Sequence, residues 1–375
     1  MRGGGGRPRV AIAHDYLTQR GGAERVVLSM LRAFPDATVH TTLYDPEGTF
    51  PEFREARIVT SPLNRSARLR RDHRRALPLL PWAVSRLPVD ADLVIASSSG
   101  WAHAVPASGR KLVYCHAPAR WLYQAEAYLG HAPSTSVTGR VLLALTPPLR
   151  RWDRRAAATA DRYLVNSTVV RDRVKQAYGI DAEILPPPFG IDPAGPSEPV
   201  RDLVDWADGY HLLVSRLLPY KNVAEAVRAF RGLDQRLVVV GHGPLEGELR
   251  AAAPGNVRVV SGLVDAQLRW VYAHSTALIA PSLEDFGLTP LEAGAFGRPT
   301  LALHAGGYLD TIAPGVSGTF FPEPTPDAIR EAVLTNVGRH WDAAAIRAHV
   351  DGFSEPHFHR RLTAAAQTLL DADPA

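Results

Sequence analysis

The chain has 375 residues, 46% of them hydrophobic, which at roughly 100 to 200 residues per domain predicts two domains with separate cores. Its longest apolar runs, such as 76–85, are broken by proline and shorter than the roughly 20 residues of a membrane-spanning helix, and the single Cys115 excludes an internal disulfide, so the expected location is the cytoplasm. The net charge of +4 is uneven: residues 1–187 hold 27 basic and 16 acidic residues, and residues 188–375 hold 15 and 22, so the two halves should meet different partners.

Short β-branched runs alternate with helical patterns along the whole chain. In the first half they predict strands at 9–13, 92–97, 111–115 and 162–165. In the second half they predict strands at 210–215, 236–240, 257–261 and 276–280, and the spacers of about 20 residues can each hold one helix. This pattern is typical of α/β domains with doubly wound parallel sheets.

A proline-rich segment marks the predicted domain boundary. Residues 186–199 contain six prolines, which disfavour a helix interior and a central strand. We therefore expect domains at 1–187 and 188–353, followed by a terminal segment at 354–375. Open parallel sheets bind ligands beyond the carboxyl ends of their strands, so the function is expected in a cleft between the two domains.

A basic segment lies at residues 64–82, where six arginines precede an apolar tail of leucine, proline and tryptophan. It fits peripheral binding to an anionic surface on the inner face of a membrane and, with equal weight, a solvated surface helix. Nucleic acid is not an expected partner, because the chain has no zinc-finger, helix-turn-helix or aromatic RNA-binding signature and its second half is acidic.

Two glutamates, Glu284 and Glu292, are separated by seven residues in a stretch that predicts a strand end, a glycine-bearing loop and a helix. Thr289 is the expected N-cap, with Pro290 at the first helical position and Glu292 closing a capping box. The free N–H groups at such a helix start suit a phosphate. The alternative interpretation is purely structural, with Glu292 as a cap residue and Glu284 as a surface turn acid.

Two cations follow the first predicted strand of the second half. Arg216 ends the strand and Lys221 comes five residues later, at the start of the next helix, so both can converge on one anion. A departing diphosphate needs such paired positive charge. Lys221 is one of only three lysines in the chain, although a pair of solvated basic residues is the alternative.

Weaker signals lie in the first half. Gly21 and Gly22 follow the first strand and open a helix, where backbone N–H groups can approach a phosphate. They lack the spaced glycines of a dinucleotide fingerprint. His116 stands at the carboxyl end of the strand at 111–115, where a structural histidine is the alternative.

Several motifs recur in the order of one known family. They are Gly-Gly-Ala-Glu at 21–24, Tyr-Cys-His-Ala-Pro-Ala-Arg-Trp at 114–121, Val-Asn-Ser-Thr at 165–168, Ser-Arg-Leu at 215–217 with the downstream lysine, Val-Val-Gly-His-Gly-Pro-Leu at 239–245, and the paired glutamates. Together they resemble the retaining nucleotide-sugar glycosyltransferases of family four, which have the GT-B fold of two facing Rossmann-like domains. Residues 354–375 look like the family's last helix, which the resemblance implies crosses back onto the first domain. The first half looks most like bacterial mannosyltransferases of polysaccharide assembly, from whose pattern Ala117, Ala119 and Trp121 depart near the expected sugar and acceptor pocket.

The resemblance implies roles for residues of the second half in binding the donor. Arg216 and Lys221 would hold the diphosphate, and Glu292 would accept hydrogen bonds from the ribose. Glu284 would face the transferred sugar. The backbone at Phe286, Gly287 and Leu288 would bind the sugar hydroxyls, and the turn with Gly262 and Leu263 would border the nucleobase.

In the first half, the resemblance implies that His116 contacts the sugar near the reacting carbon. Gly22 would donate an N–H to phosphate, and Asp15 would lie on the acceptor side. Glu284, His116, Arg216 and Lys221 are thus the expected catalytic residues. The family usually needs no metal and no cofactor beyond the nucleotide sugar, so the Asp-x-Asp patterns at 90–92 and 371–373 are not expected to bind an ion.

The leading hypothesis is a retaining transferase that moves a hexose, with mannose from GDP-mannose favoured, to a lipid-linked, phosphorylated or glycan acceptor. One alternative is a transferase that uses UDP-sugars on a small-molecule acceptor. A second is a two-domain NAD oxidoreductase, which needs Gly-x-Gly-x-x-Gly, whereas the run at 241–247 has one residue too many. A third is a non-catalytic nucleotide-sugar binder.

Overall fold

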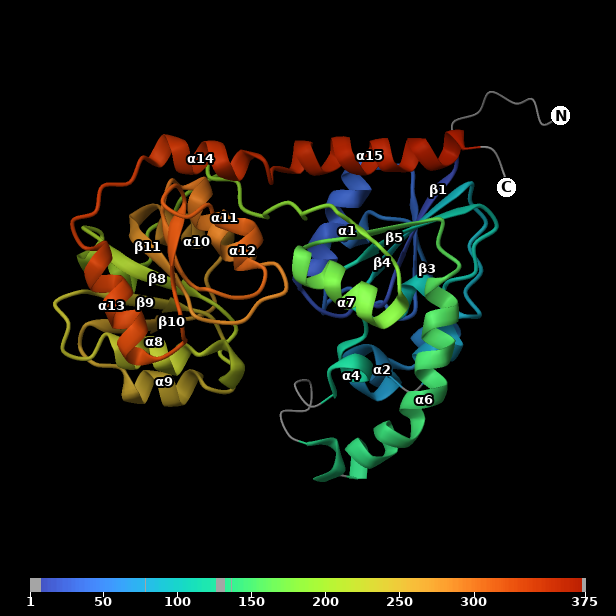
Figure 1. Ribbon diagram of the computed structural model, residues 1–375, viewed down its shortest axis with the longest axis horizontal. Helices are drawn as coiled ribbons and strands as arrows, with labels where there is room; N and C mark the ends of the chain where they lie inside the picture. The colour runs from blue at the N-terminus through green and yellow to red at the C-terminus, as the bar shows by residue number, and fades with distance from the viewer. Residues whose placement is uncertain (1–7, 78, 126–131, 136, 373–375) are drawn as a thin grey trace. The chain divides into compact units, whose positions relative to one another are not determined.

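A computed structural model describes residues 8–77, 79–125, 132–135 and 137–372 of the chain. The chain divides into two compact units, shown in Figure 1: the first unit comprises Met1–Pro188 and Phe358–Ala375, and the second comprises Phe189–His357. Each unit has its own parallel sheet and its own hydrophobic core.

The first unit is built on a seven-stranded sheet in the order β3-β2-β1-β4-β5-β6-β7, with every neighbouring pair parallel. The direction of strand addition reverses between β1 and β4, which creates a switch point in the sheet. The strands are β1 Val10–His14, β2 Thr38–Thr41, β3 Ile58–Thr60, β4 Leu93–Ser98, β5 Arg110–Cys115, β6 Arg162–Val165 and β7 Glu183–Ile184.

Side chains of the first sheet alternate between two buried cores. Ile12, Ile95 and Tyr114 lie in the core that also contains residues of α1 and α15, whereas Val94 and Val113 lie in the core that contains residues of α3 and α7. Because both faces are covered, the central strands are apolar over most of their length, with polar residues at their ends. The helices of this unit are α1 Gly22–Ala33, α2 Ala67–Arg71, α3 Leu80–Val84, α4 Arg120–Tyr123, α6 Val137–Ala157, α7 Thr168–Tyr178 and α15 Glu355–Asp371, which joins the unit from Phe358 onward.

The second unit has a six-stranded parallel sheet in the order β10-β9-β8-β11-β12-β13, with its switch point between β8 and β11. Its strands are β8 Tyr210–Val214, β9 Leu237–Val240, β10 Val257–Val260, β11 Ser275–Ala280, β12 Thr300–Leu303 and β13 Gly318–Phe321. Its helices are α8 Val223–Ala229, α9 Glu246–Ala252, α10 Asp265–His274, α11 Leu288–Ala295, α12 Tyr308–Thr311, α13 Pro326–Asn336 and α14 Ala343–Asp351.

The eight predicted strands are confirmed, each with ends within one residue of the prediction. The strands that the sequence did not indicate are β2, β3, β7, β12 and β13, which have two to four residues each. Their brevity explains the omission, since alternation over so few residues carries little signal. The α/β fold class with two doubly wound sheets is confirmed.

The predicted capping box at Thr289 is wrong. Helix α11 begins at Leu288, and its N-cap is Gly287, which has a φ of 88° and provides no side-chain cap. The glycine allows the loop to turn through the left-handed region directly into the helix, so Thr289 already lies inside the first turn. Pro290 is tolerated there because N–H groups of the first turn need no intrahelical partner.

The basic segment 64–82 is not one continuous helix. It forms the turns Pro62–Arg65 and His73–Ala76 and the short helices α2 and α3. Leu80 is buried in the first unit's core, whereas Leu79 and Trp82 are 46% and 48% exposed. None of the helices formed by the described residues combines the length and hydropathy needed to cross a bilayer.

Candidate functional site

At the switch point of the first sheet, Asp15 follows β1 and is 4% exposed. Its carboxylate accepts hydrogen bonds from the backbone N–H groups of Ser99, Trp101 and Ala102 at 2.6 to 2.7 Å. Asp15 therefore fixes the loop that follows β4. With three backbone N–H groups as donors, the Asp15 carboxylate holds the backbone of this loop in place.

A chain of polar side chains crosses the same switch point. Nδ1 of His14 donates to the carbonyl of Ser97 at 3.0 Å, because a carbonyl can only accept. The Ser97 hydroxyl lies 3.1 Å from the same nitrogen and 2.9 Å from Nε2 of His116. On the other side of the ring, Nε2 of His14 lies 3.8 Å from the buried carboxylate of Glu24 in α1. The sequence motifs containing Glu24 and His116 are thus joined through β1 and β4.

The two histidines that contact Ser97, His14 and His116, have pKa values shifted in opposite directions from that of a free histidine. Burial works against protonation of His14, but the Glu24 and Asp15 carboxylates and the hydrogen bond to Ser97 outweigh it and raise its pKa. Burial, together with the charge of His14, lowers the pKa of His116 to about 3. His116 is therefore a neutral imidazole at physiological pH, with one donor and one acceptor nitrogen.

Gly22 is the first residue of α1, and Gly21 is its N-cap. A Cβ at Gly21 would lie 2.5 Å from Oε2 of Glu24, so glycine keeps room for that carboxylate at the helix start. Gln19 donates to the other Glu24 oxygen at 3.0 Å. The helix start is therefore ordered by side chains as well as by backbone.

In the second unit, Lys221 and Glu284 form an ion pair across the switch point. Lys221 is 8% exposed and follows β8, whereas Glu284 follows β11, the neighbouring strand. The Ser282 hydroxyl donates to the same Glu284 oxygen at 2.6 Å. Asn222, next to Lys221, has a φ of 55° and donates its amide to the carbonyl of Pro281 at 2.9 Å, which ties the two loops together.

Arg216 also follows β8. Its guanidinium donates to the Tyr220 hydroxyl at 3.0 Å, and the Lys221 ammonium lies 5.1 Å from the centre of the Tyr220 ring. Tyr220 therefore lies against both predicted phosphate ligands. The structure brings Arg216, Lys221 and Glu284 to the same edge of the sheet, beyond the carboxyl ends of β8 and β11.

The loop from Glu284 to Leu288 packs closely against the start of α12. The N–H of Gly307 donates to the Glu284 carbonyl at 2.8 Å, and a Cβ at Gly307 would lie 2.3 Å from Cα of Phe286. A Cβ at Gly287 would lie 2.6 Å from the ring of Tyr308. These contacts fix the backbone that was predicted to bind the sugar.

The remaining predicted donor residues lie further along the sheet. Glu292, in α11, accepts a hydrogen bond from the Tyr272 hydroxyl at 2.7 Å. Gly262, with a φ of 72°, and Leu263 follow β10, which β9 separates from β8. Gly262 and Leu263 share the carboxyl edge of the sheet with Lys221, two strands away from it.

The sequence did not indicate site roles for His14, Glu24 and Ser97 in the first unit or for Ser282 and Tyr308 in the second, although Glu24 lies in the Gly-Gly-Ala-Glu motif. Ser282 is separated from Glu284 by one residue, so strand-end spacing could have indicated it. Tyr308 contacts Ser282 across a loop, with 3.1 Å between hydroxyls, and only the fold shows this. Among the described residues, no group of three or more His, Cys, Asp or Glu side chains is arranged to hold a metal ion.

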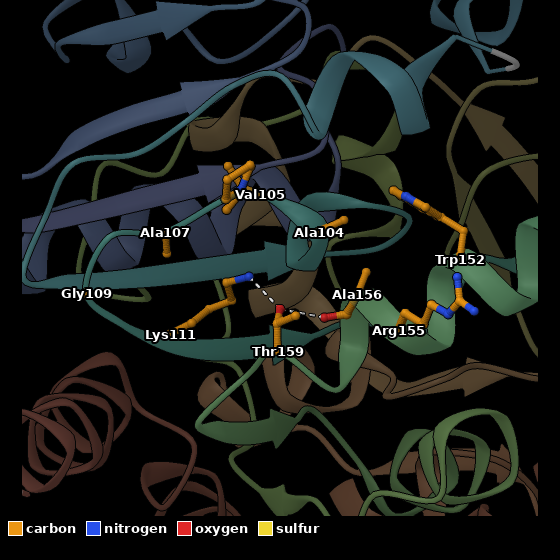
Figure 2. Close-up of a pocket in the computed structure, with 10 residues that line it drawn as sticks. Ala104, Val105, Ala107, Gly109, Lys111, Trp152, Arg155, Ala156 and Thr159 are labelled. Atoms are coloured by element: carbon orange, nitrogen blue, oxygen red, sulfur yellow. Dashed lines mark hydrogen bonds between the residues drawn. The ribbon is translucent and has the colours of Figure 1, made fainter. Parts of the chain in front are cut away.

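A separate cavity of about 440 Å³ lies beside the start of β5 (Figure 2). Lys111, 5% exposed, donates to Thr159 Oγ1 at 2.8 Å and to the His103 carbonyl at 3.2 Å, and burial lowers its pKa despite the nearby Asp161. Lys111 is at the beginning of β5 and His116 is just past its end. This cavity is therefore distinct from the predicted site.

Two family models match the chain. The model described as Glycosyltransferase Family 4 matches residues 20–194, and the model described as Glycosyl transferases group 1 matches residues 207–336. The chain belongs to these glycosyltransferases. The matched regions contain eleven of the twelve predicted site residues, and Asp15 lies just before them.

Curated relatives of this glycosyltransferase chain match parts of it. Pseudomonas aeruginosa glycogen synthase is 37% identical over 32% of the chain and 26% of its own length. The D-rhamnosyltransferase WbpZ of the same organism is 29% identical over 53% of the chain and 55% of its own length. A GDP-mannose-dependent alpha-(1-6)-phosphatidylinositol monomannoside mannosyltransferase of Mycolicibacterium smegmatis is 28% identical over 52% of the chain and 61% of its own length. The chain thus spans between about a quarter and three fifths of these relatives' lengths.

Solved structures match the glycosyltransferase over nearly its whole length. Anabaena HepE in complex with UDP and glucose has a TM-score of 0.70 at 16% identity and covers 97% of this chain and 100% of its own. The sucrose-phosphate synthase of Thermosynechococcus elongatus has a TM-score of 0.69 at 18% identity, covering 97% and 99%. These similarities confirm the predicted GT-B fold of two Rossmann-like domains.

Proposed function

We propose that this chain transfers a hexose from a nucleotide sugar to an acceptor and retains the configuration of the sugar. The observation that carries the proposal is the ion pair of buried Lys221 with Glu284 at the switch point of the second sheet. Switch points are where open parallel sheets bind ligands. A cation fixed there can stabilise the charge that develops on a departing diphosphate.

In the proposed donor site, Arg216 and Lys221 hold the diphosphate. The close position of Tyr220 to both cations supports this role, because it limits the conformations of their side chains before a ligand binds. Glu292 accepts from the ribose hydroxyls. Gly262 and Leu263, which follow β10, border the nucleobase. In the sheet, β9 and β8 lie between β10 and β11, the strand that Glu284 follows.

The transferred sugar is proposed to lie against Glu284 and the backbone of Phe286, Gly287 and Leu288. That backbone is held by contacts with α12, so its N–H groups keep their positions during the reaction. His116 would act on the same sugar as a neutral hydrogen-bond donor. When the Ser97 hydroxyl donates to Nε2 of His116, Nδ1 carries the proton and can donate to a sugar oxygen.

Two further roles are proposed for the first unit. Gly22 donates its backbone N–H to a phosphate at the start of α1. Asp15 acts on the acceptor side by holding the loop after β4 in place, because its carboxylate is taken up by three backbone N–H groups. Asp15 is thus proposed as a positioning residue.

GDP-mannose is the proposed donor. The support is the relative named as GDP-mannose-dependent and the motif at 114–121, whereas the HepE structures with UDP favour a UDP-sugar as the second candidate. We propose that no metal is required, because Arg216 and Lys221 supply the positive charge that the leaving group needs. Turnover that EDTA abolishes would contradict this part.

The proposed acceptor carries a phosphate or a lipid, and the protein is proposed to act at the inner face of a membrane. Arg68 and Arg71 are exposed, and so are the side chains of Leu79 and Trp82 in the same segment. Arginines next to apolar side chains are suited to a surface of anionic lipids. This combination supports peripheral binding through residues 64–82.

A thermal-shift screen with GDP, UDP and ADP and their sugars tests the donor, because a ligand that binds only the folded protein raises its melting temperature. We expect GDP-mannose to give the largest shift and Lys221→Ala to remove it. Release of nucleoside diphosphate by wild-type protein then separates an enzyme from a non-catalytic binder. A protein that none of these ligands stabilises would contradict the proposal.

A further inference from the structure

The hydroxyl of Ser97 lies between two histidines at the switch point of the first sheet. Ser97 is buried in β4 and faces His14 of β1 in the register of the two strands. Its hydroxyl oxygen lies 3.1 Å from Nδ1 of His14 and 2.9 Å from Nε2 of His116. Among the described residues this hydroxyl has no other hydrogen-bond partner. Its hydrogen therefore has to point to one of the two rings.

The ring of His14 cannot take that hydrogen. Nδ1 of His14 also lies 3.0 Å from the carbonyl oxygen of Ser97, which can only accept, so Nδ1 carries a proton. This is true of the neutral ring protonated at Nδ1 and of the imidazolium alike. A protonated Nδ1 donates to the two oxygens of Ser97 and accepts nothing.

The carboxylate of Glu24 keeps the ring of His14 in this orientation. Nε2 of His14 lies 3.8 Å from Oε1 of Glu24, and both side chains are buried. Gln19 donates to the same oxygen at 3.0 Å and so fixes the carboxylate. A half-turn of the His14 ring would put a carbon atom in the place of each nitrogen, so the contacts with Ser97 and Glu24 would both be lost.

The hydroxyl hydrogen of Ser97 has one acceptor left, Nε2 of His116. A buried hydroxyl hydrogen without an acceptor is costly, so Ser97 is the donor in this hydrogen bond and Nε2 carries no proton. Because His116 is a neutral ring, its single proton is on Nδ1. The backbone N–H of His116 donates to the Ser98 carbonyl at 2.8 Å, which fixes the position of the ring further.

The second ring nitrogen of His116, Nδ1, is open to a ligand. It makes no hydrogen bond with any residue that the structure describes, and it is not among the buried, unpartnered polar atoms of that part of the chain. His116 is partly exposed and lies just past the end of β5. Nδ1 is therefore accessible at the carboxyl edge of the first sheet, where open parallel sheets bind ligands.

We infer that Ser97 and His14 are positioning residues that hold the proton of His116 on Nδ1, the nitrogen that faces a ligand. The hydrogen bond made by one ring nitrogen of a histidine decides whether the other carries the proton. The network thus offers the ligand a hydrogen-bond donor, which suits a hydroxyl or ring oxygen. The inference rests on the proposed function in one respect, namely that this oxygen belongs to the transferred sugar.

Nitrogen NMR of the ligand-free protein with isotope-labelled histidine tests the network, because protonated and unprotonated ring nitrogens differ in chemical shift. His116→Gln identifies the signals of His116. Near neutral pH we expect the proton of His116 on Nδ1 in wild-type protein. Ser97→Ala should populate both tautomers, since Nε2 has lost its donor.

Ser98→Ala is the matched control. Ser98 is the next residue of β4 and is also buried, but its hydroxyl lies 3.0 Å from Nδ1 of His103. Its removal therefore costs the same strand a buried hydroxyl and should leave the proton of His116 on Nδ1. Circular dichroism and the melting temperature show that the compared variants are folded.

Two substitutions of His14 test the network without changing Ser97. An asparagine amide can donate from about the place of Nδ1, whereas the longer glutamine places its amide near that of Nε2. His14→Asn should therefore keep the proton of His116 on Nδ1, and His14→Gln should populate both tautomers. A wild-type tautomer in folded Ser97→Ala and His14→Gln proteins would overturn the inference.

Turnover separates a positioning role from a purely structural one. At saturating donor, Ser97→Ala should release nucleoside diphosphate about tenfold more slowly than Ser98→Ala, because a hydrogen bond to the sugar is weakened. If Ser97→Ala populates both tautomers and still matches Ser98→Ala in turnover, its role is not positioning and the inference is wrong.

A failure of the proposed function is recognised separately. Wild-type protein that releases no nucleoside diphosphate from any of the nucleotide sugars would contradict the proposed function. The spectra of the ligand-free protein do not depend on that result. A wild-type proton on Nε2 of His116 would refute the inference even in an active enzyme.

Discussion

Lys221 and Glu284 are 63 positions apart in the sequence, yet they form an ion pair at the ends of the neighbouring strands β8 and β11. The Glu284 oxygen that pairs with Lys221 also accepts from Ser282 at 2.6 Å. Each charge therefore orients the other. A substitution of either one leaves its partner with an uncompensated charge.

Lys221→Ala should lower turnover by about a hundredfold or more, because a fixed cation at the leaving group is lost. The rate of nucleoside diphosphate release at saturating donor measures this. Lys175→Ala is the matched control, since Lys175 is a surface lysine with a side chain that is 64% exposed, and it should keep wild-type turnover. Near wild-type turnover of a folded Lys221→Ala variant would falsify the assigned role.

The same pair predicts a pattern of stabilities. Lys221→Ala and Glu284→Ala should each lower the free energy of unfolding by on the order of 1–3 kcal/mol, because each leaves a partly buried charge unpaired. The double variant should be more stable than the sum of the two losses implies, while remaining inactive. Urea denaturation of all four proteins gives the coupling energy, and additive losses would show that the pair does not interact.

Gly287→Ala should displace the loop that is proposed to bind the sugar. The φ of 88° disfavours alanine by about 1–2 kcal/mol, and the new Cβ would lie 2.6 Å from the Tyr308 ring. Gly179→Ala is the matched control, because Gly179 has a φ of 74° but nothing within 4 Å of a Cβ. We expect both variants to lose stability and only Gly287→Ala to raise the KM for the donor. Equal KM values would argue against sugar binding by this loop.

His116 predicts an acid-dependent loss of stability. Its pKa is about 3 in the folded protein and about 6.5 when unfolded, so the unfolded chain binds the extra proton between these values and stability falls as pH falls through that range. His14 contributes in the opposite sense, since its raised pKa stabilises the fold at low pH and that contribution is lost as pH rises through the folded value.

His116→Gln should therefore flatten the fall in the free energy of unfolding between about pH 6.5 and pH 4.5. Urea midpoints at the two pH values provide the measurement. His340→Gln, which replaces an exposed histidine, should keep the wild-type slope. A His116→Gln slope equal to that of wild type would mean that His116 is not held neutral by its surroundings.

Binding to anionic vesicles should depend on residues 64–82. Arg68→Gln with Arg71→Gln should weaken co-sedimentation with anionic liposomes severalfold at low salt, because each basic residue near such a surface contributes about 1 kcal/mol. Arg201→Gln with Arg231→Gln removes two exposed arginines of the second unit as a control. Unchanged sedimentation of the first double variant would exclude this segment as the membrane contact.

Much of the fold could be predicted because its central strands are buried on both faces. The run Val-Val-Val at 238–240 and the run at 93–96 carry a strong β signal that needs no tertiary information. By contrast, β12 has the sequence Thr-Leu-Ala-Leu, which has no β-branched residue after Thr300 and suits a helix equally well. Only its pairing with β11 and β13 makes it a strand.

The candidate site was partly predictable for a related reason. Arg216 and Glu284 lie at strand ends, where parallel topology gathers functional side chains at one edge. The contact of Ser97 with both His14 and His116 depends on the register of β1 with β4 and of β4 with β5, which no local pattern encodes. Likewise, the choice of Gly287 over Thr289 as N-cap depends on the packing of the loop against Tyr308.

The packing of α15 has a consequence for biosynthesis. Phe358 and Leu362 share a buried core with Ile12 and Tyr114, so segments that precede and follow the second unit in the sequence complete one core. Translation at roughly 5–20 residues per second would take on the order of ten seconds or more to pass the second unit. Throughout that interval this face of the first sheet is covered by α1 but not by α15, so part of its core stays exposed to chaperones at the ribosome until α15 emerges.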